Sequence, residues 1–510
     1  MPEPRLGSPR HDAVARVAIA AAGIALVGIT ILRHELWRDE LQAWQIARAS
    51  HGFHDLLHNT RYEGHPFVWF GLLYPLAHGH PGPGAMQLLQ FFIASVTISV
   101  AVWRAPFTLL QKLLMVFGYF VLYEYGVLTR SYGLGAMLLV ITLAIAALPG
   151  PRRWLPIGAI LGVVALTSAF GAVVAVAVMA GLGVDEVLRR RNETGSGAER
   201  RVIVVGSALT LTALVVAYIQ AGRTPRNTGN YSHWHITFDV GLAASSVSAV
   251  WRALVPIPAL KHSYWNTNIL SARAAVVGVL GLMLFAMVAW FFRDRPGALV
   301  VWVAGVVLVV GFLYARIGTA TASRHIGHIF LCLFAAMWLA PGMERRVGAA
   351  KQTAFVDYAH ARSRAWTAML VVQVVAGVFA VGLDLAYPFS NGRDVASFIR
   401  REHLQHLEII GLPDTAASTV AGYLDRPIYY LAGARDGTYV VWDTARNTSQ
   451  PLEAVIQDPA PIDSEPRALL LVNRPLDDPN LHLRLLAHFD NGIVPDEHFW
   501  LYLGAAKPKP

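Results

Sequence analysis

Two adjacent carboxylates, Asp39 and Glu40, follow the first apolar run of the sequence and lie in the polar stretch Trp37–Arg48. A carboxylate at a membrane boundary is costly unless it is hydrated, paired with a cation or used in chemistry. Neighbouring side chains on a helix point about 100° apart. One carboxylate could therefore face a cavity while the other pairs with Arg38 or Arg48. The alternative is a solvated helix start, where acidic side chains favour the positive end of the helix dipole.

A second polar stretch, Tyr62–Phe70, places Glu63 and His65 directly before an apolar segment. Pro66 fits the first turn of a helix, where its missing N–H costs nothing. Glu63 and His65 are then expected at the mouth of that helix. The alternative is a belt of interfacial aromatic side chains with a capping acid.

Arginines stand at the ends of two later apolar runs. Arg130 lies in the stretch Tyr123–Gly133, and Arg316 and Arg324 flank the start of another run. The planar guanidinium binds two oxygens at once, which suits a phosphate. For Arg130, snorkelling or pairing with Glu124 is an equal alternative.

Histidine pairs raise the question of a metal. His325 and His328 are three residues apart and share a helix face, and His54 and His58 have a comparable spacing. A catalytic zinc site normally takes three protein ligands, and no acidic residue is obviously placed with either pair. The one cysteine, Cys332, excludes an intramolecular disulfide and a multi-cysteine metal site. The sequence therefore assigns no metal ligand and no cofactor, and a divalent metal stays open.

The elements that carry these residues belong to a membrane protein. The chain has 510 residues, of which 55% are hydrophobic and 15% charged, whereas soluble proteins carry about 25% charged residues. The net charge of +9 comes from cations in short loops between apolar runs. This placement is a topology signal, so nucleic acid is not an expected partner.

A spanning helix needs about 20 mostly apolar residues. The first run follows several arginines and lacks a small-residue cleavage site, so it is read as a retained helix. The runs 155–169 and 170–187 are short and are expected to form a tight helical hairpin joined at Phe170-Gly171. Eleven candidate spans are found, at residues 14–33, 85–103, 112–128, 133–149, 155–169, 170–187, 202–221, 271–292, 297–315, 326–341 and 365–386.

Alternate loops between these runs hold the cations, which predicts a cytoplasmic N-terminus. An odd number of spans then places the C-terminus outside. The outer loops are expected at 34–64 and 222–271. The apolar segment Pro66–His78, too short to span, is expected to lie at the membrane interface or to enter the membrane and return. We therefore predict the cytoplasmic membrane as the location.

The tail changes character, because its apolar runs shorten to strand length and alternate with polar helical patterns. We predict an α-helical polytopic membrane protein with about eleven transmembrane helices, in residues 1–388, and a C-terminal extracytoplasmic α/β domain, in residues 389–510. The expected helices are Gly392–Glu402 and Asp414–Leu424. The expected strands are His406–Ile410, Ile428–Leu431, Tyr439–Trp442, Ala468–Val472 and Phe499–Leu503.

In order and neighbours, these stretches resemble the GT-C superfamily of membrane glycosyltransferases, in the branch that includes protein O-mannosyltransferases and the lipid A aminoarabinose transferase. Asp39-Glu40 resembles the acidic pair of the first outer loop in that family. Gly64-His65-Pro66-Phe67 partly matches its next motif, although the second proline is absent. Thr129-Arg130-Ser131-Tyr132 resembles its arginine near the outer end of a later helix.

The resemblance implies a donor sugar linked to a polyprenyl phosphate or diphosphate, presented from the outer leaflet of the membrane, and inversion at the anomeric carbon. It implies a catalytic pair, with a general base at Asp39 and Glu40 as the second catalytic residue. The donor phosphate would be bound by Arg130, His65 and Arg324. Supporting roles fall to Glu63, Glu124, Tyr132 and His325. The acceptor stays open between lipid, polysaccharide and protein.

Other functions are compatible with the same layout. A transporter or flippase of a lipid-linked sugar would place charged residues near the bilayer midplane, whereas here they gather at the outer boundary. A noncatalytic scaffold would not need Asp39. A ligase of lipid-linked polysaccharide is chemically close but usually lacks the acidic pair.

Overall fold

The computed structural model describes residues 9–80, 82–191, 197–222, 225, 227–228, 235, 237–270, 273–319, 321–344, 352–449, 467–476 and 483–505. The chain divides into two compact units. The helical unit comprises Met1–Ile31, Leu89–Gly222 and His233–Val381. The loop-and-tail unit comprises Leu32–Leu88, Arg223–Ser232 and Gly382–Pro510.

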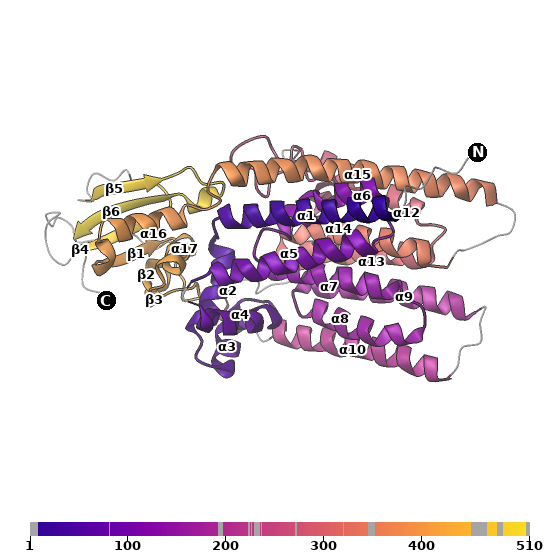
Figure 1. The fold of residues 1–510 in the computed structure, drawn as a ribbon. Coiled ribbons are helices and arrows are strands. Elements are labelled where there is room, and N and C mark those ends of the chain that lie inside the picture. Colours follow the sequence, from indigo (N-terminus) through magenta and orange to yellow (C-terminus); the bar gives the residue numbers. More distant parts are fainter. Residues whose placement is uncertain are drawn as a thin grey trace. The chain divides into compact units, whose positions relative to one another are not determined.

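Long apolar helices make up the helical unit (Figure 1). Eight helices in the described part of the chain are long and apolar enough to cross a membrane, and two shorter apolar helices accompany them. The prediction of a polytopic α-helical membrane protein is thus confirmed. The helices of this part of the chain are α1 (Pro9–Arg33), α5 (Gly84–Arg104), α6 (Leu109–Val116), α7 (Ser131–Ala146), α8 (Trp154–Ala165), α9 (Ala169–Arg190), α10 (Gly197–Gly222), α11 (Val240–Leu254), α12 (Ala274–Phe291), α13 (Pro296–Phe312), α14 (Ser323–Leu339) and α15 (Gln352–Ala386).

Three predicted features of this unit need correction. The run 112–128 is not one helix, because α6 ends at Val116 and a five-residue π-helix, Phe120–Glu124, follows. The helical hairpin exists, but α8 ends at Ala165 and the Ser168 side chain caps α9 by accepting the Gly171 N–H at 2.9 Å, so the turn precedes Phe170-Gly171. The loop predicted at 222–271 contains a helix, α11.

Small residues allow close helix packing. Helices α8 and α10 lie side by side (Figure 1). A Cβ atom added to Gly158 would lie 1.9 Å from the Gly206 carbonyl oxygen, and one added to Gly206 would lie 2.2 Å from the Trp154 carbonyl oxygen. The Thr210 hydroxyl donates to the Gly158 carbonyl at 3.0 Å. Helices in lipid commonly associate through such small-residue contacts.

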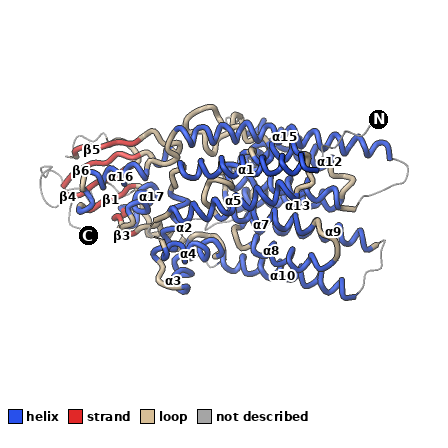
Figure 2. The backbone as a smooth tube through the Cα atoms, in the orientation of Figure 1, coloured by secondary structure: helices blue, strands red, loops and turns tan. Residues whose placement is uncertain are grey.

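The tail forms the predicted α/β domain, with its strands gathered in one sheet (Figure 2). The sheet has the order β3-β2-β1-β4-β6-β5, in which β1 runs parallel to β2 and β4, and the remaining pairs are antiparallel. The elements are α16 (Gly392–Arg401), α17 (Asp414–Leu424), β1 (Glu408–Leu412), β2 (Ile428–Tyr430), β3 (Arg435–Gly437), β4 (Arg467–Val472), β5 (Arg484–Phe489) and β6 (Phe499–Ala505).

Helices α16 and α17 pack their apolar faces against this sheet around a core that includes Val395, Val420, Leu469 and Leu501. Both predicted helices and four of the five predicted strands are present at or near their expected positions. The predicted strand Tyr439–Trp442 is wrong, because that segment is irregular.

The first loop packs with the tail in the same compact unit. It contains α2 (Arg38–Ala49), α3 (Phe53–Asn59) and α4 (Val68–Gly79). The Gln42 amide on α2 donates to the Val440 carbonyl at 2.7 Å and accepts the Val440 N–H at 3.0 Å. This side chain therefore takes the backbone bonds that a strand partner would have supplied. The domain boundary between residues 388 and 389 stays a prediction.

Candidate functional site

The acidic loop, residues 34–40, connects the end of α1 to the first turn of α2. Its turn is fixed by Glu40, whose carboxylate accepts the Trp37 backbone N–H at 3.1 Å. An acid three residues after the N-cap commonly satisfies such an N–H. Glu40 is fully buried, so it has a structural task at the start of α2.

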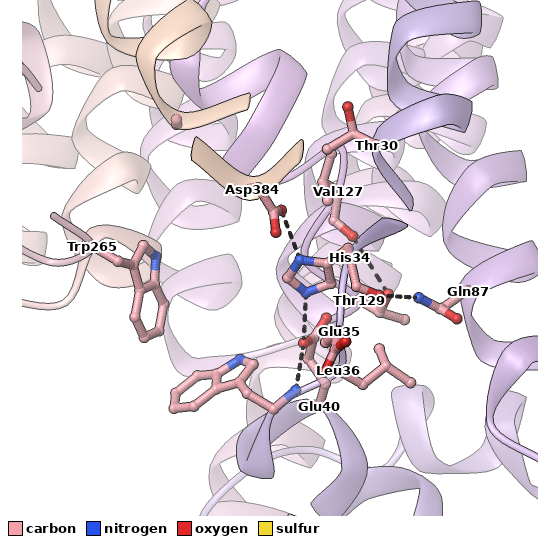
Figure 3. Close-up of polar contacts among 12 residues, drawn as sticks. Thr30, His34, Glu35, Leu36, Glu40, Gln87, Val127, Thr129, Trp265 and Asp384 are labelled. Atoms are coloured by element: carbon pink, nitrogen blue, oxygen red, sulfur yellow. Dashed lines mark hydrogen bonds and ion pairs between the residues drawn. The ribbon is translucent and has the colours of Figure 1, made fainter. Parts of the chain in front are cut away.

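A buried histidine joins the acidic loop to the end of α15. His34 Nδ1 lies 2.8 Å from Asp384 Oδ2, and His34 Nε2 lies 3.1 Å from Glu40 Oε2. Figure 3 shows the imidazole ring between the two carboxylates. Burial by itself would lower the pKa of His34, but Asp384 and Glu40 outweigh it and raise this pKa to about 10. His34 is therefore an imidazolium at neutral pH.

Glu35 is a further buried acid of the acidic loop. Its Oε1 atom lies 3.9 Å from Arg393 Nη1. Burial raises the pKa of Glu35 to about 7, against the opposing effect of the Arg393 guanidinium. The same guanidinium donates to the His34 carbonyl at 3.0 Å. Arg393 on α16 therefore ties the tail to both the backbone and the charge of this loop.

Glu497 holds the other side of the turn. Its carboxylate accepts the Arg38 backbone N–H at 2.8 Å and the Ser390 hydroxyl. Burial raises the pKa of Glu497 to about 7, although the nearby Arg38 favours the ionised form. Glu497, at the contact between the tail and α2, therefore takes up a proton as the pH falls through about 7.

Asp39 and Glu40 have different surroundings. The Asp39 side chain keeps 24% of its surface exposed and lies 3.7 Å from Arg38 Nε, whereas Glu40 is fully buried against His34. The expected separation of the pair is thus present, but the partner of Glu40 is His34. Arg48 pairs instead with Asp425, at 2.8 Å.

The second polar stretch is attached to α2. Glu63 Oε1 accepts the Gln42 amide N–H at 2.8 Å. His65 is half-buried in the bend that precedes α4. Since α4 begins at Val68, Pro66 lies just before the helix rather than in its first turn.

The other predicted residues gather in the helical unit around Glu124. Glu124 is buried at the end of the π-helix, and its Oε2 atom accepts from the Tyr119 hydroxyl at 2.8 Å and the Trp265 indole N–H at 3.3 Å. Such π-helical turns are frequent at functional sites. Glu124 interacts electrostatically with both Arg130 and Arg324.

Each of the two arginines lies close to an aromatic ring. The Arg130 guanidinium lies 5.6 Å from the centroid of the Tyr132 ring, and that of Arg324 lies 5.8 Å from the Trp265 ring. The Tyr132 hydroxyl is 3.2 Å from His325 Nε2. Two cations, one buried acid and an imidazole are thus concentrated at one end of α7 and α14, an arrangement that can bind an anion.

The structure therefore distributes the predicted residues over two clusters. The loop-and-tail unit holds Asp39, Glu40, Glu63 and His65. The helical unit holds Glu124, Arg130, Tyr132, Arg324 and His325. Among the described residues, no group of three or more His, Cys, Asp or Glu side chains is arranged to hold a metal ion.

Sequence reasoning missed His34, Asp384, Arg393 and Glu497. One signal was present, because Asp384 is the one charged residue of the apolar run 365–386, and ionisable residues in such runs are usually paired or functional. Arg393 and Glu497 carried no comparable signal. Their importance comes from contacts over more than 350 residues of chain.

The fold and these clusters define a class: a polytopic helical membrane protein with a C-terminal α/β domain and charged clusters in the motifs that resemble GT-C glycosyltransferases. Two similar solved structures are of ArnT from Cupriavidus metallidurans, one bound to undecaprenyl phosphate and one in the apo state. The TM-scores are 0.49 and 0.48, at 13% identity, with 96% of this chain and 97% of ArnT covered. A likeness of this degree transfers no residue's role. No family model matches this sequence, and no curated protein matches it.

Proposed function

We propose that this protein is a glycosyltransferase that moves a sugar from a polyprenyl-phosphate-linked donor to an acceptor at the outer face of the cytoplasmic membrane. The motifs in their order support this proposal, as do the apolar helices that can cross a membrane. The N-terminus is then cytoplasmic and the C-terminal domain extracytoplasmic, as the loop charges predict.

Asp39 is the proposed general base. The observation that carries this assignment is the contrast within the acidic pair: Glu40 is fully buried in a cap and an ion pair, whereas Asp39 keeps 24% of its side chain exposed. A base needs access to the proton that it removes. Asp39 has that access, and Glu40 supports the turn on which Asp39 lies.

Arg130 and Arg324 are the proposed ligands of the donor phosphate, with His65 as a further contact. In the transfer step, the acceptor hydroxyl or amine attacks the anomeric carbon and gives its proton to Asp39. The bond between that carbon and the phosphate oxygen breaks, and the phosphate leaves with the electron pair. Because the acceptor attacks from the face opposite the leaving phosphate, the configuration of the anomeric carbon is inverted. The leaving anion needs charge stabilisation more than protonation, and fixed cations supply it.

The first experiment measures transfer from labelled polyprenyl-phosphate sugars in membranes, comparing wild type, Asp39→Asn and Asp425→Asn at equal protein levels. Asp425 offers a matched control, because it is an exposed acid of the same unit. We expect Asp39→Asn to lose about a hundredfold or more of the activity, as loss of a general base typically costs 10²–10⁴-fold. Asp425→Asn should transfer at the wild-type rate.

Each other outcome has a defined meaning. Equal transfer by wild type and Asp39→Asn would overturn the assignment of Asp39. Movement of the lipid-linked sugar between leaflets without transfer by wild type would favour a transporter.

A further inference from the structure

Three ionisable side chains from distant parts of the chain meet in the loop-and-tail unit without contact with solvent. They are His34 after α1, Glu40 on α2 and Asp384 near the end of α15. Their exposed fractions are 0%, 0% and 2%. An isolated buried charge is very costly, and breaking a buried ion pair leaves such a charge behind. The three charges therefore depend on one another.

The geometry fits a protonated His34 between two ionised acids. Both ring nitrogens of His34 lie within hydrogen-bond distance of a carboxylate oxygen, at 2.8 and 3.1 Å. An ionised carboxylate accepts hydrogen bonds and cannot donate them, and a neutral imidazole has one N–H. Only an imidazolium donates to both carboxylates. The pKa of about 10 for His34, set by these acids against the effect of burial, agrees with this state.

His34 is also held through its backbone and its ring face. Its carbonyl accepts from Arg393 Nη2 at 3.0 Å and from the Gln87 amide at 3.1 Å. Its ring centroid lies 4.7 Å from that of Phe389. The carboxylate oxygen of Glu40 that faces His34 also accepts the Trp37 N–H, which starts α2. The position of His34 therefore fixes the turn that precedes Asp39.

We propose that His34, held between Glu40 and Asp384, is a positioning residue for sugar transfer that sets the direction of the Asp39 carboxylate. This inference rests on the proposed function and adds a role for His34 and Asp384, which none of the motifs includes. A displacement of about 1 Å in a reacting group can cost about a hundredfold in rate. His34, Glu40 and Asp384 act through Asp39 and do not touch the substrate.

The test replaces one charge and follows the pH dependence. Asp384→Asn keeps the shape but removes a carboxylate that raises the pKa of His34, so His34 should lose its proton within the working pH range. The other charged groups around His34 are Glu40 on α2, Glu35 in its own loop and Arg393 on α16. We expect a kcat about ten- to a hundredfold below wild type at pH 8.5, with an unchanged KM for the donor. The ratio of variant to wild-type kcat should recover as the pH falls to 6.

Two further variants separate charge from structure. Asp384→Glu keeps the carboxylate and should restore at least a third of wild-type kcat. His34→Gln has no titratable ring, so its loss of kcat should not change with pH. Asp425→Asn removes an exposed acid and should behave as wild type. All rates are normalised to monodisperse, folded protein.

The outcomes distinguish this inference from the proposed function. If wild type transfers sugar and Asp39→Asn does not, but Asp384→Asn keeps the kcat and the pH profile of wild type, the inference is wrong and the proposed function stands. A loss in Asp384→Asn that only follows the amount of folded protein, or that is equal at every pH, would also overturn it. No transfer by wild type would overturn the proposed function, and this inference with it.

Discussion

Asp39 and Glu40 are adjacent in the chain, yet one carboxylate is accessible and the other is closed inside the protein. The difference follows from the start of α2, where Glu40 turns back to the Trp37 N–H and to His34. The same change of an acid to its amide should therefore have different consequences at the two positions. At Asp39 it removes the proposed general base, and at Glu40 it removes a partner of the buried His34.

Glu40→Gln should lower the stability of the protein. The amide cannot balance the charge of His34, and loss of one partner of a buried pair is costly, so we expect a loss of roughly 2 kcal/mol or more in the free energy of unfolding. Thermal unfolding in detergent measures this against Asp39→Asn, which should unfold close to wild type. A Glu40→Gln variant as stable as wild type would contradict the structural role of Glu40.

The stability of the loop-and-tail unit should depend on pH through Glu497. Its pKa is about 7 in the folded protein against an ordinary value of 4.5. The folded state therefore binds more protons than the unfolded state between these values, and stability falls as the pH rises from 4.5 to 7. In Glu497→Gln this fall should be smaller, by an amount on the order of 1–3 kcal/mol. The measurement is the free energy of unfolding of wild type and Glu497→Gln at pH 5, 6, 7 and 8. Parallel curves of this free energy against pH would contradict the prediction.

The sequence was informative about residue types and less so about partners. Asp39, Arg130 and Arg324 could be selected because charged residues at the boundary of an apolar run need a reason. His34 could not be selected in the same way, because its meaning depends on Asp384, 350 residues away. Contacts of this kind are set by tertiary packing, which local patterns do not encode.

At the scale of elements, the helical unit depends on glycines where helices meet. Gly158 and Gly206 face each other across α8 and α10, with no room for a methyl group at either position. By contrast, a Cβ added at Gly183 on α9 would meet no atom within 4 Å. The packing of α8 on α10 is therefore specified by individual positions rather than by hydrophobicity alone.

Gly206→Ala should separate these helices. The new Cβ would lie 2.2 Å from a backbone oxygen of α8, and this oxygen cannot move without the rest of the helix. We therefore expect the free energy of unfolding to fall by about 1–3 kcal/mol. Gly183→Ala should be neutral or slightly stabilising, because alanine favours a helix over glycine. The yield of monodisperse protein and its unfolding temperature measure both variants. Equal behaviour of the two would contradict the packing argument.

Elements were predictable where one local rule decided them. The spans follow from apolar length, and α17 occurs at the expected residues, Asp414–Leu424. The predicted strand Tyr439–Trp442 failed because its pattern resembles a strand while its backbone pairs with the Gln42 side chain. The prediction of one helix over 112–128 failed because the π-helix that follows α6 is set by packing, not by composition.

At the scale of the whole molecule, the C-terminal tail completes the first loop. Gln45 on α2 donates to the Ser418 carbonyl at 2.7 Å, and the Tyr423 hydroxyl donates to the Leu36 carbonyl at 3.1 Å. With the contacts of Arg393 and Glu497, the tail reaches each turn of the segment that carries Asp39. A domain that is remote in sequence thus belongs to the proposed catalytic loop.

Deletion of residues 389–510 should abolish sugar transfer and should make α2 less ordered. Without these contacts we expect transfer to fall by a hundredfold or more, and backbone hydrogens of residues 38–49 to exchange faster. Hydrogen exchange followed by mass spectrometry measures the second effect, with α8 and α10 as an internal control that should stay protected. A truncated protein that keeps transfer and protection of α2 would contradict this role of the tail.

The hydrogen bond between the Arg38 backbone and Glu497 joins residues separated by 459 positions. A ribosome adds roughly 5–20 residues per second, so on the order of half a minute or more passes between synthesis of the two. During that time the acidic loop has been made but lacks the groups that hold it. The nascent protein therefore acquires its proposed catalytic geometry last, and chains released early by stop codons in the tail cannot acquire it.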